Sequence, residues 1–345
     1  MYYPYKIILL DKVAFMRAEY LYFAILFFVF LAFIMVVCMI MIVLNKSRSK
    51  GKRRSIAAQM EDWLMDVILE KEGKANDIFA VPPHIINLLQ TSIAKKVLLR
   101  ELMKVKKSLS GVSAKNIELL YAQLELDKVS LQRLESKKWH IKAKGIQELA
   151  VMHQHSQYDL LFNFTNHPDM MVRMEAQTSI VRLNGYKGLE FFDNLSYPLS
   201  EWHQLNLLHL LAHEPVMEEH GVIKWLHSSN PTVAQFSLKL IAGQHALEFY
   251  DEVITCLHHT EEVVRKEAIL CLGQIPSPAV AIELNNHYAA ETDKNIRLCI
   301  IDEFQRAGSR QDFPFLQTLQ QADDADVKLA ANKTVLYLEK NLRSL

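Results

Sequence analysis

Histidine is the residue type in this chain that could most readily do chemistry, because imidazole binds metals and transfers protons near neutral pH. The 345-residue sequence contains 14 histidines. In the segment HLLAH, His209 and His213 lie one helical turn apart, a spacing that can hold a metal ion. Leu210 stands where the zinc-protease motif H-E-x-x-H has its glutamate. This pair supports a metal-dependent enzyme only as an alternative hypothesis, and we predict no metal site.

The other reactive residue types form no recognisable site. The segments HQH (153–155) and HH (258–259) lack companion carboxylates at ligand spacing, and the four cysteines lack C-x-x-C spacing. The sequence has neither a glycine-rich phosphate loop nor a Ser-His-Asp signature. We therefore predict no catalytic residue, no cofactor and no small-molecule substrate.

A residue pattern, marked in most copies by a basic side chain, recurs through the second half of the chain at a nearly fixed interval. Taking the arginine of MVRMEA as the marker, equivalent positions can be set at Lys142, Arg173, His203, Ala234, Arg265, Arg297 and Lys328. The steps between them are 31, 30, 31, 31, 32 and 31 residues. A period this constant is typical of a stacked array in which each unit has two helices.

The residues around each marker predict one buried helix face. Position −1 is large and apolar, position +3 is mostly small and position +7 is apolar, as in Val172, Ala176 and Ile180. These offsets share one side of a helix, and the small residue lets a neighbouring helix approach. Position −4 is acidic in four units, at Asp169, Glu261, Asp293 and Asp324. We expect these acids to cap the helices and the marker cations to be capping partners rather than a binding ladder.

These units resemble HEAT repeats of the short-period bacterial type, the type also found in phycobilin lyases. DMMVRMEAQTSIVRL and EEVVRKEAILCLG carry the resemblance best, over about residues 137–340, whereas the units at His203 and Ala234 depart from the pattern. The resemblance implies an all-α fold, a right-handed α-α superhelix. Deoxyhypusine hydroxylases, which are HEAT-like enzymes, use several His-Glu dipeptides, but only His213-Glu214 matches here. The lyase residues cannot be assigned, so neither activity is expected.

Residues 21–44 are 24 positions without a charge. A helix of that length spans about 36 Å, enough to cross a hydrocarbon core of about 30 Å, and the run is too long for a signal peptide. Six cations follow it, at Lys46, Arg48, Lys50, Lys52, Arg53 and Arg54. This flank predicts a single-pass helix with the C-terminal domain in the cytoplasm. The resemblance to bacterial HEAT proteins implies that the membrane is a bacterial inner membrane. We expect the six cations to contact anionic lipid head groups.

Charge is unevenly distributed in this chain of zero net charge. Residues 45–140 carry 19 basic and 11 acidic side chains, whereas residues 141–345 carry 17 and 26. The acidic half repels phosphate, and the lysines of the middle segment suit a helix face near an anionic membrane, so we predict no nucleic-acid binding.

The expected organisation has five parts. They are a short extracytoplasmic N-terminus (1–20), the transmembrane helix (21–44), a basic juxtamembrane linker (45–54), a helical segment (55–136) and about seven HEAT-like units (137–345). Within the helical segment, one helix is expected to run from Pro83 to Gly111, with Ile86 and Ile93 on its buried side. The arrangement is similar to that of bacterial proteins with a membrane helix ahead of a HEAT array.

The leading functional prediction is a membrane-anchored cytoplasmic scaffold or adaptor that binds a protein partner, as an accessory subunit of a membrane or envelope-biosynthesis machine. Partner contact is expected on the exposed side of the marker helices, at Arg182, Lys239, Asp302, Glu303 and Arg306. Besides the metal-dependent enzyme, a regulatory membrane protein is an alternative, although only about 20 residues would lie outside the membrane to sense a signal.

Overall fold

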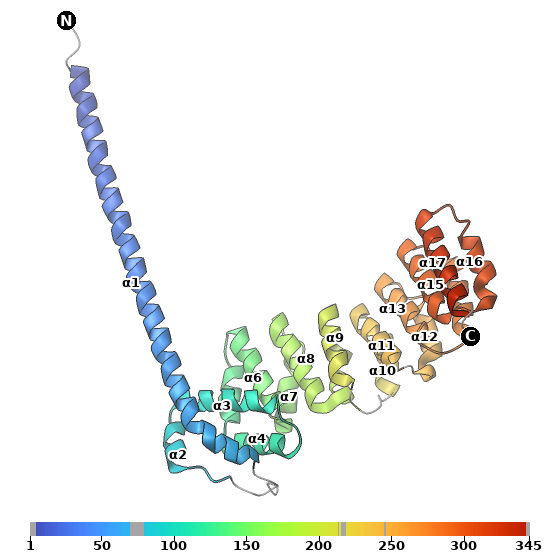
Figure 1. Ribbon diagram of the computed structural model, residues 1–345, viewed down its shortest axis with the longest axis horizontal. Helices are drawn as coiled ribbons and strands as arrows, with labels where there is room; N and C mark the ends of the chain where they lie inside the picture. The colour runs from blue at the N-terminus through green and yellow to red at the C-terminus, as the bar shows by residue number, and fades with distance from the viewer. Residues whose placement is uncertain (1–4, 70–78, 213, 215–218, 245, 343–345) are drawn as a thin grey trace. The chain divides into compact units, whose positions relative to one another are not determined.

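The computed structural model is helical throughout the part of the chain that it describes, residues 5–69, 79–212, 214, 219–244 and 246–342 (Figure 1). No strand occurs among these residues, which confirms the predicted all-α class. The chain forms two compact units, residues 1–126 and 127–345. The boundary therefore falls after residue 126 and not, as predicted, after residue 136.

The first unit is built on one long helix, α1 (Tyr5–Leu69). From Tyr20 onward it contains the one described helix that is long and apolar enough to cross a membrane, with a mean hydropathy of 3.3 and none of that window buried. The helix continues through residues 45–54, where the sequence predicts a linker. Lysine and arginine are good helix formers and no proline interrupts the segment, so nothing ends the helix there.

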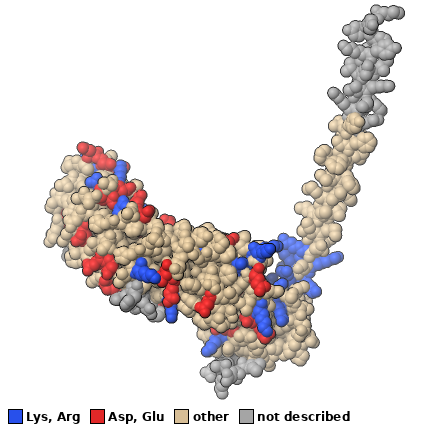
Figure 2. Space-filling model, turned by 180° about the vertical axis from the view of Figure 1, so that it is seen from behind, with Lys and Arg blue, Asp and Glu red and all other residues tan. Residues whose placement is uncertain are grey.

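Six cations surround α1 just after its apolar part, at Lys46, Arg48, Lys50, Lys52, Arg53 and Arg54, and all six are exposed. At about 100° per residue, these positions point to every side of the helix. We call this ring the basic collar. Basic side chains gather on α1 at this level in Figure 2.

The last turns of α1 form the core of the first unit. Five large residues on one side of the helix are buried, namely Ile56, Met60, Trp63, Leu64 and Val67, the stripe that helical periodicity predicts. They face α3 (Ser92–Lys106) and α4 (Gly111–Gln123), which both pack on α1.

The predicted single helix from Pro83 to Gly111 is wrong, because the chain breaks it at Thr91. The Thr91 hydroxyl accepts from the N–H of Ala94 at 3.2 Å, which caps α3 and ends α2 (Pro83–Leu89). The break changes the direction of the chain. Ile86 and Ile93, expected on one buried face, are consequently 47% and 42% exposed.

Seven helices of the second unit carry the marker positions. They are α6 (Trp139–Val151), α8 (Met170–Asn184), α9 (Glu201–Leu211), α11 (Pro231–Gln244), α13 (Glu262–Leu272), α15 (Lys294–Ala307) and α17 (Ala325–Leu342). Figure 1 shows them following one another side by side in chain order. Between them lie α7 (Tyr158–Phe162), η2 (Gly185–Asn194), α10 (Glu219–Leu226), α12 (Tyr250–Cys256), α14 (Ala279–Ala290) and α16 (Phe313–Leu319).

One continuous apolar core runs through this array, from Leu134 to Leu338. Among the described residues, no single repeat has a separate core, as expected for a stack of helix pairs. Close approach depends on the small residue at position +3: a Cβ on Gly145 would lie 2.7 Å from the carbonyl oxygen of Ser130 in α5 (Asp127–Leu134). Because α5 packs on α6, it belongs to the array. The handedness of the superhelix stays a prediction.

The third repeat, which contains α9, is shifted by one residue from the predicted register. Trp202, expected to be buried at position −1, is 68% exposed, whereas the predicted marker His203 is 1% exposed. Ser200 caps α9 by accepting from the N–H of His203, so Ser200 is the residue at position −4. The true marker is therefore Gln204, and the leucines three and seven residues after it are both buried.

Candidate functional site

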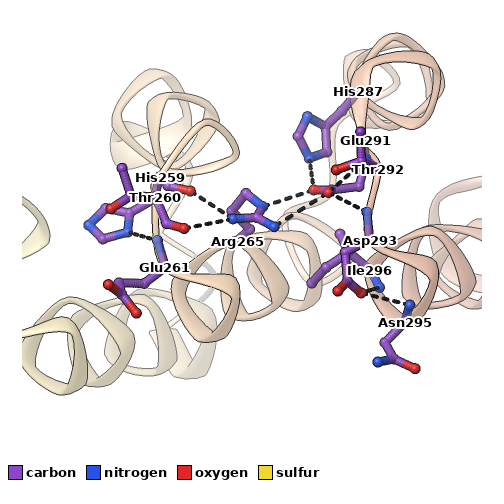
Figure 3. Close-up of polar contacts among 10 residues, drawn as sticks. All are labelled: His259, Thr260, Glu261, Arg265, His287, Glu291, Thr292, Asp293, Asn295 and Ile296. Carbon is purple, nitrogen blue, oxygen red and sulfur yellow. Dashed lines mark hydrogen bonds and ion pairs between the residues drawn. The ribbon is translucent and has the colours of Figure 1, made fainter.

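Two of the three marker arginines, Arg173 and Arg265, hold the turn that precedes their own helix, and Figure 3 shows this for Arg265. The third, Arg297, instead lies over the ring of Tyr288, 4.4 Å from its centre. Arg265 donates through Nη1 to the carbonyl oxygens of His259 and Thr260, each at 3.0 Å. Arg173 makes the same two bonds, to the residues six and five positions before it. Gln204 makes one of them, to the carbonyl of Leu199. The prediction that these cations are capping partners is confirmed for the two arginines.

A second hydrogen bond recurs in the same turns. The side chain six residues before the marker accepts from the backbone N–H four residues before it. This bond joins Ser136 to Lys138, His167 to Asp169, Ser228 to Asn230, His259 to Glu261 and Glu291 to Asp293. The acceptor is a serine, a histidine or a glutamate, so no single residue type marks the position, and sequence reasoning missed it.

Three of the four predicted acidic caps are present. Asp169, Asp293 and Asp324 each accept from the backbone N–H groups two and three residues further on. Glu261 makes no such bond. Its side chain is one methylene longer, which suits an N-cap less well. Asn230, which is not acidic, takes this place in the fourth unit.

A buried group of polar side chains, Arg265, His287 and Glu291, connects the repeat of α13 to the repeat of α15 (Figure 3), and we call it the polar joint. Arg265 Nε lies 2.8 Å from Glu291 Oε2, and Glu291 Oε1 accepts from the N–H groups of Thr292 and Asp293, both at 2.9 Å. His287 Nε2 lies 3.4 Å from the same carboxylate. Burial by itself would raise the pKa of Glu291, but the backbone donors and Arg265 outweigh it and lower that pKa. Burial lowers the pKa of His287, which favours its neutral form.

A second polar network links α9, α11 and α13, and we call it the polar ladder. Gln204 Nε2 donates to Gln235 Oε1 at 3.1 Å, and Lys239 Nζ donates to Gln204 Oε1 at 3.0 Å. Glu267 Oε2 completes it, 3.3 Å from Gln235 Nε2 and 3.6 Å from Lys239 Nζ. Lys239, a predicted partner residue, therefore already has partners within the array, and its side chain is 19% exposed.

The other predicted partner residues differ in exposure. Asp302 and Arg306 on α15 are exposed, and Arg182 on α8 is half-buried. Glu303 is only 4% exposed and receives two bonds from Arg306 Nη1, at 2.8 and 3.0 Å. The prediction that Glu303 lies on an exposed contact surface is wrong, because its carboxylate packs into the space that Gly273 leaves free.

Of the two histidines considered as metal ligands, His209 and His213, the structure describes one. His209 is exposed on α9, whereas His213 lies outside the described residues. Within the described residues, no group of three histidine, cysteine, aspartate or glutamate side chains has the geometry of a metal site.

A surface pocket of about 250 Å³ opens between η2, α9 and α11, lined among others by Tyr186, Leu208, Glu214, Lys239 and Gln244. This volume is below the range of about 300–1,000 Å³ that is typical for small-molecule ligands.

Four large apolar side chains are exposed at the beginning of α8 and α9, which pack against each other. Met170, Met171, Trp202 and Leu205 are 51%, 50%, 68% and 60% exposed. We call this group the Met-Trp patch. Large apolar side chains that are exposed on neighbouring helices are candidates for a protein-binding site, and tryptophan is enriched among the residues that dominate binding energy. Sequence reasoning missed the patch because it assigned Trp202 to the core.

Comparison with known proteins identifies no family. No family model and no curated protein match the chain. Human deoxyhypusine hydroxylase, in complex with glycerol, matches 83% of this chain and 98% of its own, at 12% identity and a TM-score of 0.34. A mutant of Kap121p matches 82% and 41%, at 11% identity and a TM-score of 0.49. The CpcE–CpcF complex of phycocyanin lyase from a Nostoc species matches 78% and 91%, at 16% identity and a TM-score of 0.26.

These identities and TM-scores carry no function over to this chain. The helix stacking, the polar ladder and the Met-Trp patch are what its own structure offers.

Proposed function

We propose that this protein is a membrane-anchored scaffold whose helical array binds a protein partner in the cytoplasm. The Met-Trp patch is the observation that carries the proposal. Trp202 and Leu205 project from the array at 68% and 60% exposure, although the turns around them are held by internal hydrogen bonds. Apolar side chains that contribute nothing to their own fold are best explained by a partner that buries them.

The composition of the patch favours a protein over a small molecule. Trp202, Met170 and Met171 are aromatic and methionine side chains that are half or more exposed. Protein interfaces are enriched in these residue types relative to the rest of a protein surface.

Membrane anchoring is supported by α1. Its apolar part is entirely exposed, as expected of a helix whose neighbours are lipids. The basic collar follows immediately and favours the cytoplasmic side for both units. Anchoring raises the local concentration of the array near membrane-bound partners, which suits an accessory subunit of a membrane or envelope-biosynthesis machine.

Affinity capture of the full chain from detergent-solubilised membranes tests the scaffold. The double substitution Met171→Ala with Trp202→Ala should lower partner recovery at least about tenfold, since removing a hot-spot residue costs about 2 kcal/mol or more. The matched control is Leu329→Ala with Leu336→Ala on α17, which removes side chains that are 69% and 67% exposed. Equal recovery with both variants would exclude the Met-Trp patch as the binding site.

Anchoring is tested separately by alkaline carbonate extraction of membranes and by a fluorescent protein fused to the C-terminus. We expect the full chain to stay in the membrane pellet and the fusion to fluoresce in the cytoplasm. Release into the supernatant would contradict the anchor, and a fusion exported without fluorescence would contradict the orientation.

A further inference from the structure

We infer that α3 carries a second surface for anionic lipid head groups, beside the basic collar, so that the first unit lies directly against the membrane. This inference depends on the proposed anchoring by α1 and adds a contact that holds the folded part of the unit to the lipid surface.

The exposed side of α3 is a cationic stripe. Ile93, Lys96, Arg100, Lys104 and Lys107 follow one another at intervals of three or four residues, which places them on one side of the helix. The side chains of Arg100 and Lys104 are 40% and 64% exposed. The rest of the helix surface includes buried residues, at Ala94, Val97, Leu98 and Leu102.

The stripe keeps a net positive charge. Glu101 is the acid nearest to it, and its carboxylate oxygens lie 2.9 Å from Arg100 and 2.8 Å from Lys104. Among the described residues, Lys96 and Lys107 form no ion pair of 4.0 Å or less with an acid. Two exposed lysines at the ends of the stripe are therefore available to phosphate groups.

Exposed apolar side chains accompany the cations. Ile93 on the stripe is 42% exposed, and Ile86 on the neighbouring α2 is 47% exposed. Basic residues beside exposed isoleucines are the composition of a helix that lies in the interface, where the cations meet head groups and the apolar side chains reach the acyl boundary.

The acidic residues of the unit support this orientation. Glu61, Asp62 and Asp66 of α1 are all exposed, on the side of the helix away from the buried residues that face α3 and α4. One side of the unit is thus basic and another acidic. An anionic membrane attracts the first and repels the second.

The length of α1 brings the stripe close to the membrane. From Leu44, the end of the apolar segment, to Ile56, the first buried residue, the helix rises about 18 Å. α3 lies beside α1 toward its apolar part, whereas α4 lies along the last turns, where Asn116 and Ser113 donate to the carbonyls of Val67 and Ile68 (Figure 1). Continuity with the collar favours lipid over nucleic acid as the source of the phosphate groups.

Lysine labelling of the full chain in lipid nanodiscs tests the inference. An amine-reactive reagent is applied in phosphatidylcholine alone and with added phosphatidylglycerol, and each lysine is quantified by mass spectrometry. We expect labelling of Lys96 and Lys107 to fall about threefold or more with the anionic lipid and to recover at high salt, which screens charges. Lys115, exposed on α4, is the control and should not change.

A variant gives an independent measurement. Lys96→Glu with Lys107→Glu should abolish the lipid-dependent protection of Lys104, and Lys115→Glu should leave it intact. Because the substituted side chains are exposed, both variants are expected to fold.

The outcomes separate this inference from the proposed anchor. If the collar lysines are protected but Lys96 and Lys107 label equally in both lipids, the α3 surface is overturned and the anchor stands. If the chain does not enter nanodiscs, the anchor itself is overturned. If single-stranded RNA protects Lys96 and Lys107 in phosphatidylcholine nanodiscs, the assignment to lipid is overturned.

Discussion

Arg265 of α13 reaches Glu291, ahead of α15, with its Nε 2.8 Å from the carboxylate Oε2. The two side chains are 17% and 4% exposed, so this ion pair lies inside the joint between consecutive units. In a stack without private cores, each unit is stabilised mainly by such contacts with its neighbours. The joint is therefore a place where one substitution should loosen the array locally.

Arg265→Leu should destabilise the joint by about 3 kcal/mol, because it leaves the Glu291 carboxylate buried without its cation. Hydrogen exchange of the full chain would show this as faster exchange in α13 and α15, with α6 and α8 unchanged. Lys294→Ala is the control: Lys294 pairs with Asp324 and Asp326 at the surface and is 50% exposed, so its loss should leave the exchange rates nearly unchanged. Equal effects would show that the buried pair has no special role.

Gln204→Ala should destabilise α9 by about 2 kcal/mol, whereas Trp202→Ala should change stability by less than about 0.5 kcal/mol. Gln204 is fully buried and bonds to Leu199, Gln235 and Lys239, while Trp202 is 68% exposed. Exchange rates of α9 and α11 in both variants provide the measurement. If Trp202→Ala destabilised the protein more than Gln204→Ala, the register predicted from the sequence, with His203 as the marker, would be the correct one.

The spacing of the repeats was predictable because the residues of the buried face recur with the same sizes, large at position −1 and small at position +3. Six of the seven marker helices have the predicted register. The exception, α9, has Trp202 at a position where size suggests burial and Gln204 at a position where polarity suggests exposure. Only the cap at Ser200 distinguishes the two registers, and a serine is too common to be decisive by itself.

Acidification should loosen α8 and α9, because burial, together with the nearby Arg173, lowers the pKa of His203 to about 4. The Nε2 of Gln177 donates to the Thr165 carbonyl, so its Oε1 accepts a hydrogen bond from the Nε2–H of His203, at 2.8 Å. The folded-state pKa is below the unfolded value of about 6.5, so the unfolded state binds more protons between these values. Stability is highest above pH 6.5 and should fall by up to about 3 kcal/mol as the pH approaches 4.

The measurement is hydrogen exchange of α8 and α9 between pH 6.5 and 4, corrected for the intrinsic pH dependence of exchange. His203→Gln, which keeps a donor toward Gln177, should remove the extra loss of protection at low pH. A variant that loosens as much as the wild type would exclude His203 as the cause.

Gly145→Ala and Gly243→Ala should change stability in opposite directions. A Cβ at Gly145 would meet Ser130 O at 2.7 Å and Arg133 Cβ at 2.9 Å, so α5 must shift, at a cost of about 2 kcal/mol. A Cβ at Gly243 meets nothing within 4 Å, and alanine favours the helix by about 1 kcal/mol. Exchange protection of α5–α6 and of α11 would report the two effects. Two changes of the same sign would contradict the close packing of α5 on α6.

The candidate surfaces were less predictable than the fold. Exposed positions on a marker helix can be recognised by spacing, which placed Asp302 and Arg306 correctly at the surface. Spacing does not show that Gly273 opens a space for the Glu303 carboxylate, nor that Lys239 bonds to Gln204 on another helix. Such contacts depend on which residues of neighbouring helices meet, and a single helix pattern contains no information about its neighbour.

The unbroken course of α1 has a mechanical consequence. A stretch of 24 apolar residues is about 36 Å long, which exceeds a hydrocarbon thickness of about 30 Å, and a helix with this excess tilts in the bilayer. In the proposed anchor, the same helix ends as the core of the first unit, with Trp63 and Val67 buried. A thicker or thinner bilayer would then change the tilt of α1 and, with it, the orientation of the first unit at the membrane surface.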